Sequence, residues 1–161
     1  MIHCIRRLEW DAAHRVPLHE SKCRALHGHR YVAELYCEAP ALDELGRVID
    51  FGVVKDIVGT WIDSNWDHTC ILMHPDNDPE VQSAGGVGLA VDMVKAISAF
   101  NGLVAGRPVY WMTVHPTAEN IAAHLGDMAN ELFEQAGSPV RCVKIRLWET
   151  PNGSVEWSAD K

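Results

Sequence analysis

Two stretches of the chain alternate apolar and polar residues with a period of two, and both carry histidine on the apolar parity. The first stretch, residues 2–14, ends at His14, and the second, residues 27–37, begins with His27 and His29. Side chains of a β-strand point alternately to the two faces of a sheet, so both stretches are predicted to be strands with one buried face. The histidines of both strands are therefore expected on the buried side of one sheet.

The rest of the chain mixes helical periodicity with short apolar runs. A 3.6-residue apolar stripe predicts helices over residues 51–65 (with Asp50 as N-cap), 88–100 and 117–136. Strands are predicted over residues 109–113 and 140–149, and around Val155 and Trp157. Loops are predicted over residues 15–26 and 74–86, the second with a short turn of helix. Strands separated by long helices predict an α+β fold with an antiparallel sheet.

Size, charge and cysteine content exclude several classes of protein. A length of 161 residues suits a single domain, here predicted over 1–161. The net charge of −8 argues against nucleic acid as a partner. No apolar run approaches the roughly 18 residues of a membrane span, and the N-terminus lacks the apolar stretch of a secretory signal, so a cytoplasmic protein is expected. The five cysteines are scattered singly, which argues against a disulfide framework.

The segment His27-Gly28-His29 places two imidazoles on the same side of a strand. His14 shares the apolar parity of the preceding strand and would add a third. Three imidazoles that converge from neighbouring strands are typical of a catalytic zinc site, because they leave a fourth position for water or substrate. The alternative is three ordinary histidines that are bonded to solvent or backbone.

Two further groups are candidates for proton transfer. Cys23 lies between Lys22 and Arg24 in the loop that joins the histidine-bearing strands, and positive neighbours or a nearby metal favour its thiolate. Asp67 precedes His68, and a carboxylate beside an imidazole can orient it for acid–base work. The alternatives are a bystander cysteine and an ordinary surface pair.

Glu149 interrupts an apolar strand face that is otherwise formed by Val143, Ile145 and Leu147. A carboxylate there needs partners, and a ligand with two parallel N–H donors, such as a pterin or guanine, would supply them. The alternative is a strand-end glutamate in solvent. Thr117 is the predicted N-cap of the long helix.

Taken together, these motifs resemble the 6-pyruvoyltetrahydropterin synthase family. The matching segments are Asp11-Ala12-Ala13-His14, Cys23-Arg24-Ala25-Leu26-His27-Gly28-His29, Val48-Ile49-Asp50-Phe51, Asp67-His68, Pro116-Thr117-Ala118-Glu119-Asn120 and Trp148-Glu149-Thr150. Within the family, the spacing Cys-x-x-x-His-Gly-His resembles the bacterial 6-carboxytetrahydropterin synthases of the queuosine pathway. The chain departs from the family pattern at Trp66 (usually leucine) and Leu72 (where asparagine is expected), and its segment at about 74–114 is extended.

The resemblance implies a fold, an activity and a role for each matching residue. The implied fold is the tunnelling fold (T-fold), a four-stranded antiparallel sheet with helices on one face, assembled as a homo-oligomer, often a hexamer, with active sites between subunits. The implied roles are zinc binding by His14, His27 and His29, proton transfer by Cys23, Asp67 and His68, and pterin binding by Glu149 with help from Thr117.

The implied reaction is a carbon–carbon lyase reaction. It converts 7,8-dihydroneopterin triphosphate to 6-carboxy-5,6,7,8-tetrahydropterin, acetaldehyde and triphosphate. One alternative is 6-pyruvoyl formation by elimination of triphosphate from the same substrate. Another is a pterin- or purine-binding module without catalysis.

Overall fold

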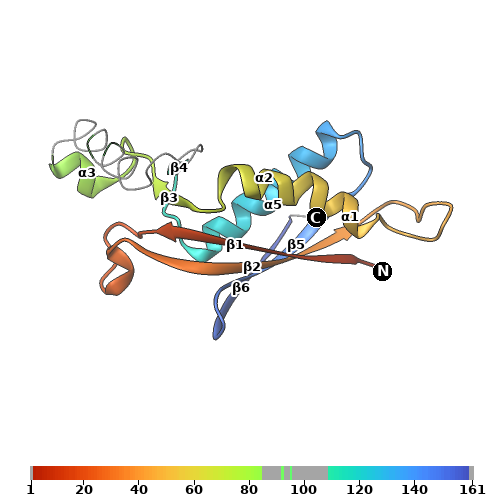
Figure 1. Cartoon of the computed structure of the whole chain (residues 1–161), viewed down its shortest axis with the longest axis horizontal. Coiled ribbons are helices and arrows are strands. Elements are labelled where there is room, and N and C mark those ends of the chain that lie inside the picture. Colours follow the sequence, from red (N-terminus) through yellow and green to blue (C-terminus); the bar gives the residue numbers. More distant parts are fainter. Residues whose placement is uncertain (1, 85–91, 93–94, 96–108, 160–161) are drawn as a thin grey trace. The chain divides into compact units, whose positions relative to one another are not determined.

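The computed structural model describes residues 2–84, 92, 95 and 109–159 (Figure 1). Its strands are β1 (Cys4–His14), β2 (His27–Glu38), β3 (Thr69–Met73), β4 (Val109–Met112), β5 (Arg141–Thr150) and β6 (Gly153–Ser158). Its helices are α1 (Phe51–Val54), α2 (Thr60–Asn65), α3 (Pro79–Ala84) and α5 (Ala118–Gln135). A π-helical segment, Lys55–Gly59, joins α1 to α2, and a 3-10 turn covers Lys22–Arg24.

The helix predicted over 51–65 is confirmed as the succession of α1, the π-helical segment and α2. It begins where expected, since the Asp50 carboxylate accepts a hydrogen bond from the Gly52 N–H at 2.7 Å. Phe51, the first apolar residue of this segment, is 56% exposed and so lies off the buried stripe. The helix predicted over 88–100 lies outside the described residues apart from Asp92 and Lys95. Of the helices described, none is both long and apolar enough to cross a membrane.

The sheet differs from the expected four antiparallel strands. Over the described residues it has six strands, in the order β4-β3-β1-β2-β5-β6. The pairings β2–β5 and β5–β6 are antiparallel, as expected, but β3 runs parallel to β1, and β4 runs parallel to β3. The residues of β3 were not predicted as a strand because four of its five residues are buried and apolar–polar alternation is absent.

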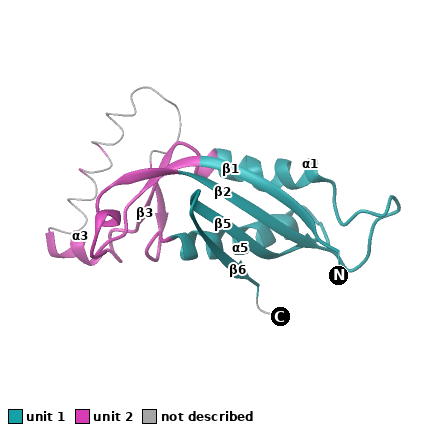
Figure 2. Cartoon of the chain, turned by 90° about the horizontal axis from the view of Figure 1, so that it is seen from below, with its two compact units in different colours: residues 1–10, 30–63, 118–161 teal, residues 11–29, 64–117 magenta. Residues whose placement is uncertain are grey.

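The chain divides into two compact units (Figure 2). Unit 1, in teal, comprises Met1–Trp10, Arg30–Asp63 and Ala118–Lys161. Unit 2, in magenta, comprises Asp11–His29 and Ser64–Thr117. Strands β1 and β2 contribute residues to both units. The single domain over 1–161 remains a prediction.

Unit 1 is built on the packing of α5 against β5 and β6. The apolar stripe of α5 is buried as predicted, with Ile121, Leu125 and Phe133 fully excluded from solvent. At Gly126 the helix approaches β6 so closely that a Cβ atom would lie 2.1 Å from the ring of Trp157. The helix and the hairpin therefore depend on the absence of a side chain at this position.

The apolar face predicted for β5 is wrong at Val143, because the pairing of β5 with β2 changes register there. Tyr36 pairs with Lys144, whereas Cys37 pairs with Cys142, which leaves Val143 without a Cα partner on β2. This irregularity turns the strand, so that Cys142 is fully buried and Val143 only partly. Ile145 and Leu147 remain on the buried face as expected.

Candidate functional site

The imidazoles of His14, His27 and His29 come together in unit 2, where β1 ends and β2 begins. One ring nitrogen from each residue lies within 4.8 Å of the other two. The ring centroids are 4.6 to 5.1 Å apart, and His14 is almost fully buried. The convergence expected from strand parity is therefore present.

The protonation of two of these rings follows from their backbone contacts. His14 Nδ1 lies 2.8 Å from the Pro116 carbonyl oxygen, and His27 Nδ1 lies 2.7 Å from the Ala25 carbonyl oxygen. A carbonyl oxygen only accepts hydrogen bonds, so each Nδ1 carries a hydrogen and donates it. The Nε2 atoms of His14 and His27, which lie 3.1 Å apart, are then both lone-pair sites. Two lone pairs at this distance repel, so the arrangement favours a cation between them, either a proton or a metal ion.

These donors fit zinc. With zinc–nitrogen bonds of about 2.0–2.1 Å and tetrahedral angles, two nitrogen ligands lie roughly 3.3 Å apart, close to the separation of the two Nε2 atoms. Imidazoles that bind metals commonly donate their other N–H to a backbone carbonyl, which fixes the tautomer and the ring orientation. The carbonyls of Pro116 and Ala25 act in this way here. Neither carbonyl could be identified from the sequence, because contacts of the backbone carry no residue signal.

Gly28 allows the two histidine-bearing strands to approach each other. A Cβ atom at this position would lie 3.3 Å from the Ala12 carbonyl oxygen and 3.7 Å from the Ala13 Cα. Both contacts are with backbone, which cannot rotate away. A larger residue here would separate the strands and move the histidines on either side of it.

Asp67 and His68 form a second charged group in unit 2. The Asp67 carboxylate accepts a hydrogen bond from the Asp11 N–H at 3.0 Å, and its other oxygen lies 2.7 Å from His68 Nδ1. The backbone N–H of His68 donates a hydrogen bond to the Asp11 carbonyl oxygen at 2.7 Å. His68 has a left-handed backbone (φ 58°), a conformation that is uncommon for residues other than glycine.

This geometry suits His68 to proton transfer. The carboxylate holds the hydrogen on Nδ1, which leaves Nε2 as the basic nitrogen of a side chain that is 77% exposed. Asp11, Asp67 and His68 also each place one possible ligand atom within 4.8 Å of the other two. The role of the Asp11 backbone as the anchor of this pair was not predicted.

Cys23 lies in the 3-10 turn and is the only cysteine of the chain that is not buried. Burial raises the pKa of the Cys4 and Cys70 thiols, and a hydrogen bond to Cys142 together with burial raises the pKa of Cys37. These thiols are held in the protonated, unreactive form. Cys23 is therefore the thiol best placed by accessibility for chemistry.

Glu149 lies in unit 1, at an irregularity of the β5–β6 hairpin. Trp148 pairs with Ser154 and Thr150 pairs with Gly153, so Glu149 is an extra residue between two pairs. Such a bulge redirects a side chain and is frequent next to active sites. Glu149 is half-buried.

Thr117 lies in unit 2 and directly precedes α5. Its N–H donates to the His115 carbonyl at 2.8 Å, and its side chain is half-buried.

The two departures from the family pattern are core residues. Trp66 is fully buried and meets Tyr110 edge to face, with ring centroids 5.9 Å apart. Leu72 lies on β3 and is 4% exposed. Both substitutions are therefore accommodated by packing within unit 2.

The chain is similar over nearly its whole length to several known proteins. The family model described as 6-pyruvoyl tetrahydropterin synthase matches residues 3–160. The 6-carboxy-5,6,7,8-tetrahydropterin synthase of Rickettsia felis is 41% identical over 158 residues, which cover 97% of this chain and 99% of the relative. The protein of the same name from Aquifex aeolicus is 31% identical over 142 residues, which cover 87% of this chain and 78% of the relative.

Solved structures show the same fold at lower identity. An uncharacterized protein from Wolinella succinogenes superposes with a TM-score of 0.74 at 20% identity, over 99% of this chain and 98% of that one. The 6-pyruvoyl tetrahydropterin synthase of Caenorhabditis elegans superposes with a TM-score of 0.60 at 19% identity, over 99% and 96%. From its sequence match over nearly the whole length, the chain belongs to the 6-pyruvoyl tetrahydropterin synthase family.

Proposed function

We propose that the chain is a zinc-dependent lyase that converts 7,8-dihydroneopterin triphosphate and water to 6-carboxy-5,6,7,8-tetrahydropterin, acetaldehyde and triphosphate. Support comes from relatives named 6-carboxy-5,6,7,8-tetrahydropterin synthase that match almost the whole chain. It also comes from the four-residue spacing between Cys23 and His27, which fits the same branch of the family. In this role the enzyme would supply a precursor for queuosine.

The observation that carries the zinc proposal is the pair of Nε2 atoms of His14 and His27, 3.1 Å apart, with both Nδ1 atoms held by carbonyls. His14, His27 and His29 would hold the ion. Bound zinc would supply Lewis-acid polarisation of the hydroxyl and carbonyl oxygens of the substrate side chain.

Protons would be moved by groups of unit 2. The Cys23 thiolate would take a proton from the substrate side chain, since it is the accessible thiol of the chain. His68 would exchange protons with it or with the substrate through Nε2, while Asp67 keeps the hydrogen on Nδ1. The 77% exposure of the His68 side chain supports the expectation that this pair serves a site completed by a neighbouring subunit, in a homo-oligomer such as a hexamer.

The pterin ring would be held by Glu149. A carboxylate binds the 2-amino group and the N3–H of a pterin through two parallel hydrogen bonds, and this pairing orients the ring as well as retaining it. The bulge that redirects Glu149 supports a role other than strand packing. Thr117 would assist in binding the ring.

Product analysis tests the proposal. Zinc-loaded protein is incubated with 7,8-dihydroneopterin triphosphate, and all products are identified by mass spectrometry. We expect 6-carboxytetrahydropterin and acetaldehyde in equal amounts. The Cys23→Ala variant should lose turnover, whereas Cys70→Ala, which removes a buried thiol, should keep it.

The other outcomes distinguish the alternatives. Triphosphate release with a 6-pyruvoyl product and no acetaldehyde would favour 6-pyruvoyl formation, the activity in the name of the matching family model. Binding of the substrate without any product would indicate a pterin-binding module. Full turnover by Cys23→Ala would show that the thiolate role is wrong.

A further inference from the structure

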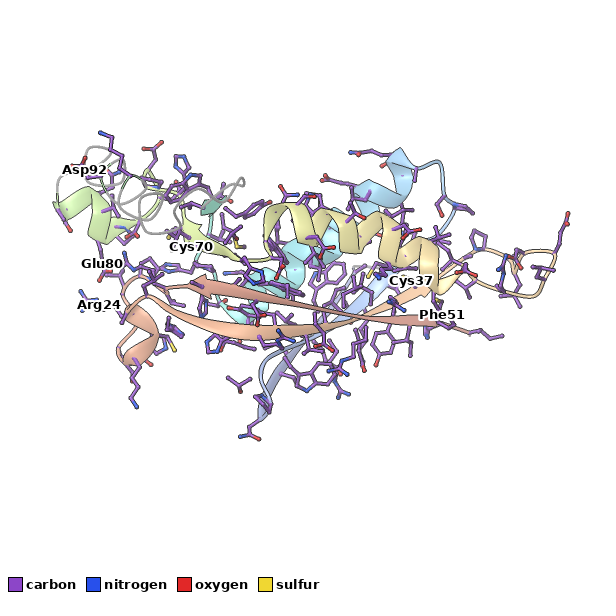
Figure 3. All side chains as sticks on the ribbon, viewed as in Figure 1. Arg24, Cys37, Phe51, Cys70, Glu80 and Asp92 are labelled. Carbon is purple, nitrogen blue, oxygen red and sulfur yellow. The ribbon has the colours of Figure 1, made fainter. Side chains whose placement is uncertain are left out.

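The carboxylate of Glu80, on α3, contacts the loop of residues 15–26 at two points. Arg15 Nη2 forms an ion pair with one of its oxygens, and Arg24 Nε lies 2.5 Å from the other. Figure 3 shows Glu80 beside Arg24, with the two side chains coming from separate elements of unit 2. One side chain therefore contacts the loop near both of its ends.

The two arginines lie next to residues of the candidate site. Arg15 directly follows His14, and Arg24 directly follows Cys23. Between them, the Val16 N–H donates to the Cys23 carbonyl at 2.8 Å and closes the neck of the loop. Arg15 and Arg24 are thus the sequence neighbours of Val16 and Cys23, the two residues that this hydrogen bond joins.

Asp78 fixes the carboxylate in place. It caps α3 by accepting hydrogen bonds from the N–H groups of Glu80 at 2.9 Å and Val81 at 3.3 Å. Its other oxygen lies 3.3 Å from Arg15 Nη1. One arginine therefore bridges the helix cap and Glu80, which orients the Glu80 carboxylate toward the loop.

The pairing is better shielded than an ordinary surface ion pair. The side chains of Arg15 and Glu80 are only 15% and 18% exposed, whereas Arg24 is 62% exposed. Burial alone would raise the pKa of Glu80, but the hydrogen bond from Arg24 and the charges of Arg15 and Arg24 hold it below its usual value. The carboxylate is therefore charged at neutral pH.

We infer that Glu80 is a positioning residue that locks the loop of residues 15–26 and thereby fixes Cys23 relative to the strand end that carries His14. Its importance for catalysis rests on the proposed function, whereas its effect on the thiol does not. This proposal gives a role to α3, which follows β3 in a segment to which the family resemblance assigns no role.

The test compares Glu80→Gln with Glu20→Gln. Both variants remove one negative charge, but Glu20 is 88% exposed on the same loop and has no arginine partner among the described residues. In zinc-loaded protein, the rate of Cys23 alkylation by iodoacetamide is followed by peptide mass spectrometry. We expect Glu80→Gln to react several-fold faster than wild type and Glu20→Gln to react at the wild-type rate, while both retain full zinc content.

Turnover provides the second readout. We expect kcat of Glu80→Gln to fall about 10-fold to 100-fold with KM within about twofold, the pattern of a misplaced reacting group. Arg15→Gln, which removes the other partner of Glu80 and leaves the charges beside Cys23 in place, should reproduce both effects, and Arg15→Lys should restore them in part. This series also serves if Glu80→Gln fails to fold.

The outcomes separate the two proposals. Unchanged alkylation in Glu80→Gln and Arg15→Gln would overturn the lock. Faster alkylation with unchanged kcat would overturn its catalytic role. If wild-type protein does not convert the pterin substrate, the proposed function fails, but the alkylation rates still decide whether Glu80 locks the loop.

Discussion

His14 Nε2 and His27 Nε2 face each other at 3.1 Å, while the opposite nitrogen of each ring is held by a carbonyl of a different loop residue, Pro116 or Ala25. Backbone carbonyls thus help to fix the orientation of both rings. Sites of this kind are preorganised, because the ligands need little rearrangement when an ion binds.

Removal of one imidazole should abolish zinc binding without unfolding the chain. We expect His27→Ala to lower zinc affinity by more than about 100-fold, since loss of a direct ligand should exceed the effect of losing an outer-shell partner. Bound zinc is measured by inductively coupled plasma mass spectrometry after dialysis. His19→Ala, in the adjoining loop, should bind as wild type, and equal zinc loss in both variants would contradict the assignment.

Asp67→Asn should impair proton transfer while leaving zinc bound. The amide cannot stabilise the His68 imidazolium and can hold the wrong tautomer, so kcat should fall by about 10²–10⁴. The measurements are kcat at saturating substrate and the zinc content of the same sample. A wild-type kcat in this variant would exclude Asp67 from the proton relay.

Glu149→Gln should weaken pterin binding. Loss of a charge-assisted, two-point hydrogen bond costs about 1.5–3 kcal/mol, which corresponds to a roughly 10-fold to 150-fold higher Kd. Isothermal titration with 7,8-dihydroneopterin measures the change. Glu156→Gln is the control on the same hairpin, because Glu156 pairs with Lys144 at 3.0 Å rather than lying at the bulge. Equal affinities of the two variants would refute the pterin-anchor role.

Gly126→Ala should destabilise unit 1, although alanine normally favours helices. The new Cβ would lie 2.1 Å from the Trp157 ring, and such overpacking costs about 1–3 kcal/mol. Gly59→Ala is the matched control, because its Cβ would meet only side-chain atoms, at 3.4 and 3.5 Å. Urea unfolding should show a loss for Gly126→Ala and little change or a gain for Gly59→Ala.

The stability of the fold should fall on acidification because of His124. Burial lowers the pKa of His124, although the charges of Asp127 and Glu131 raise it in part. An unfolded histidine titrates near about 6.5, so the unfolded chain takes up this proton first as pH falls. His124 therefore contributes fully to the free energy of unfolding above about pH 6.5, and this contribution is lost as the pH falls below that value. His124→Gln should reduce the difference in urea midpoint between neutral and mildly acidic pH, and an unchanged difference would contradict this prediction.

The elements that the sequence predicted best are those with strong periodicity. Strands β1, β2 and β5 and the long helix α5 follow from alternation or from a 3.6-residue stripe, because each has one buried and one exposed face. The same parity predicted that His14, His27 and His29 would converge. Strand β3 was missed because burial on both faces removes the alternation that marks a strand.

The missed features of the site are made by backbone or by distant residues. The carbonyls of Pro116 and Ala25 and the Asp11 peptide leave no trace in residue identity. Glu80 lies 56 positions after Arg24, in a segment that was predicted only as a loop with a turn of helix. A contact of this separation depends on tertiary structure, which local patterns do not encode.

The three histidines and Cys23 are positioned by different kinds of structure. The imidazoles belong to strands, whose register is set by pairing, whereas Cys23 belongs to a loop that is held by α3. Insertions or deletions between residues 15 and 26 would therefore shift the thiol while leaving the imidazoles in place. In the proposed enzyme, this separation would let evolution change the position of the thiol without rebuilding the histidine cluster.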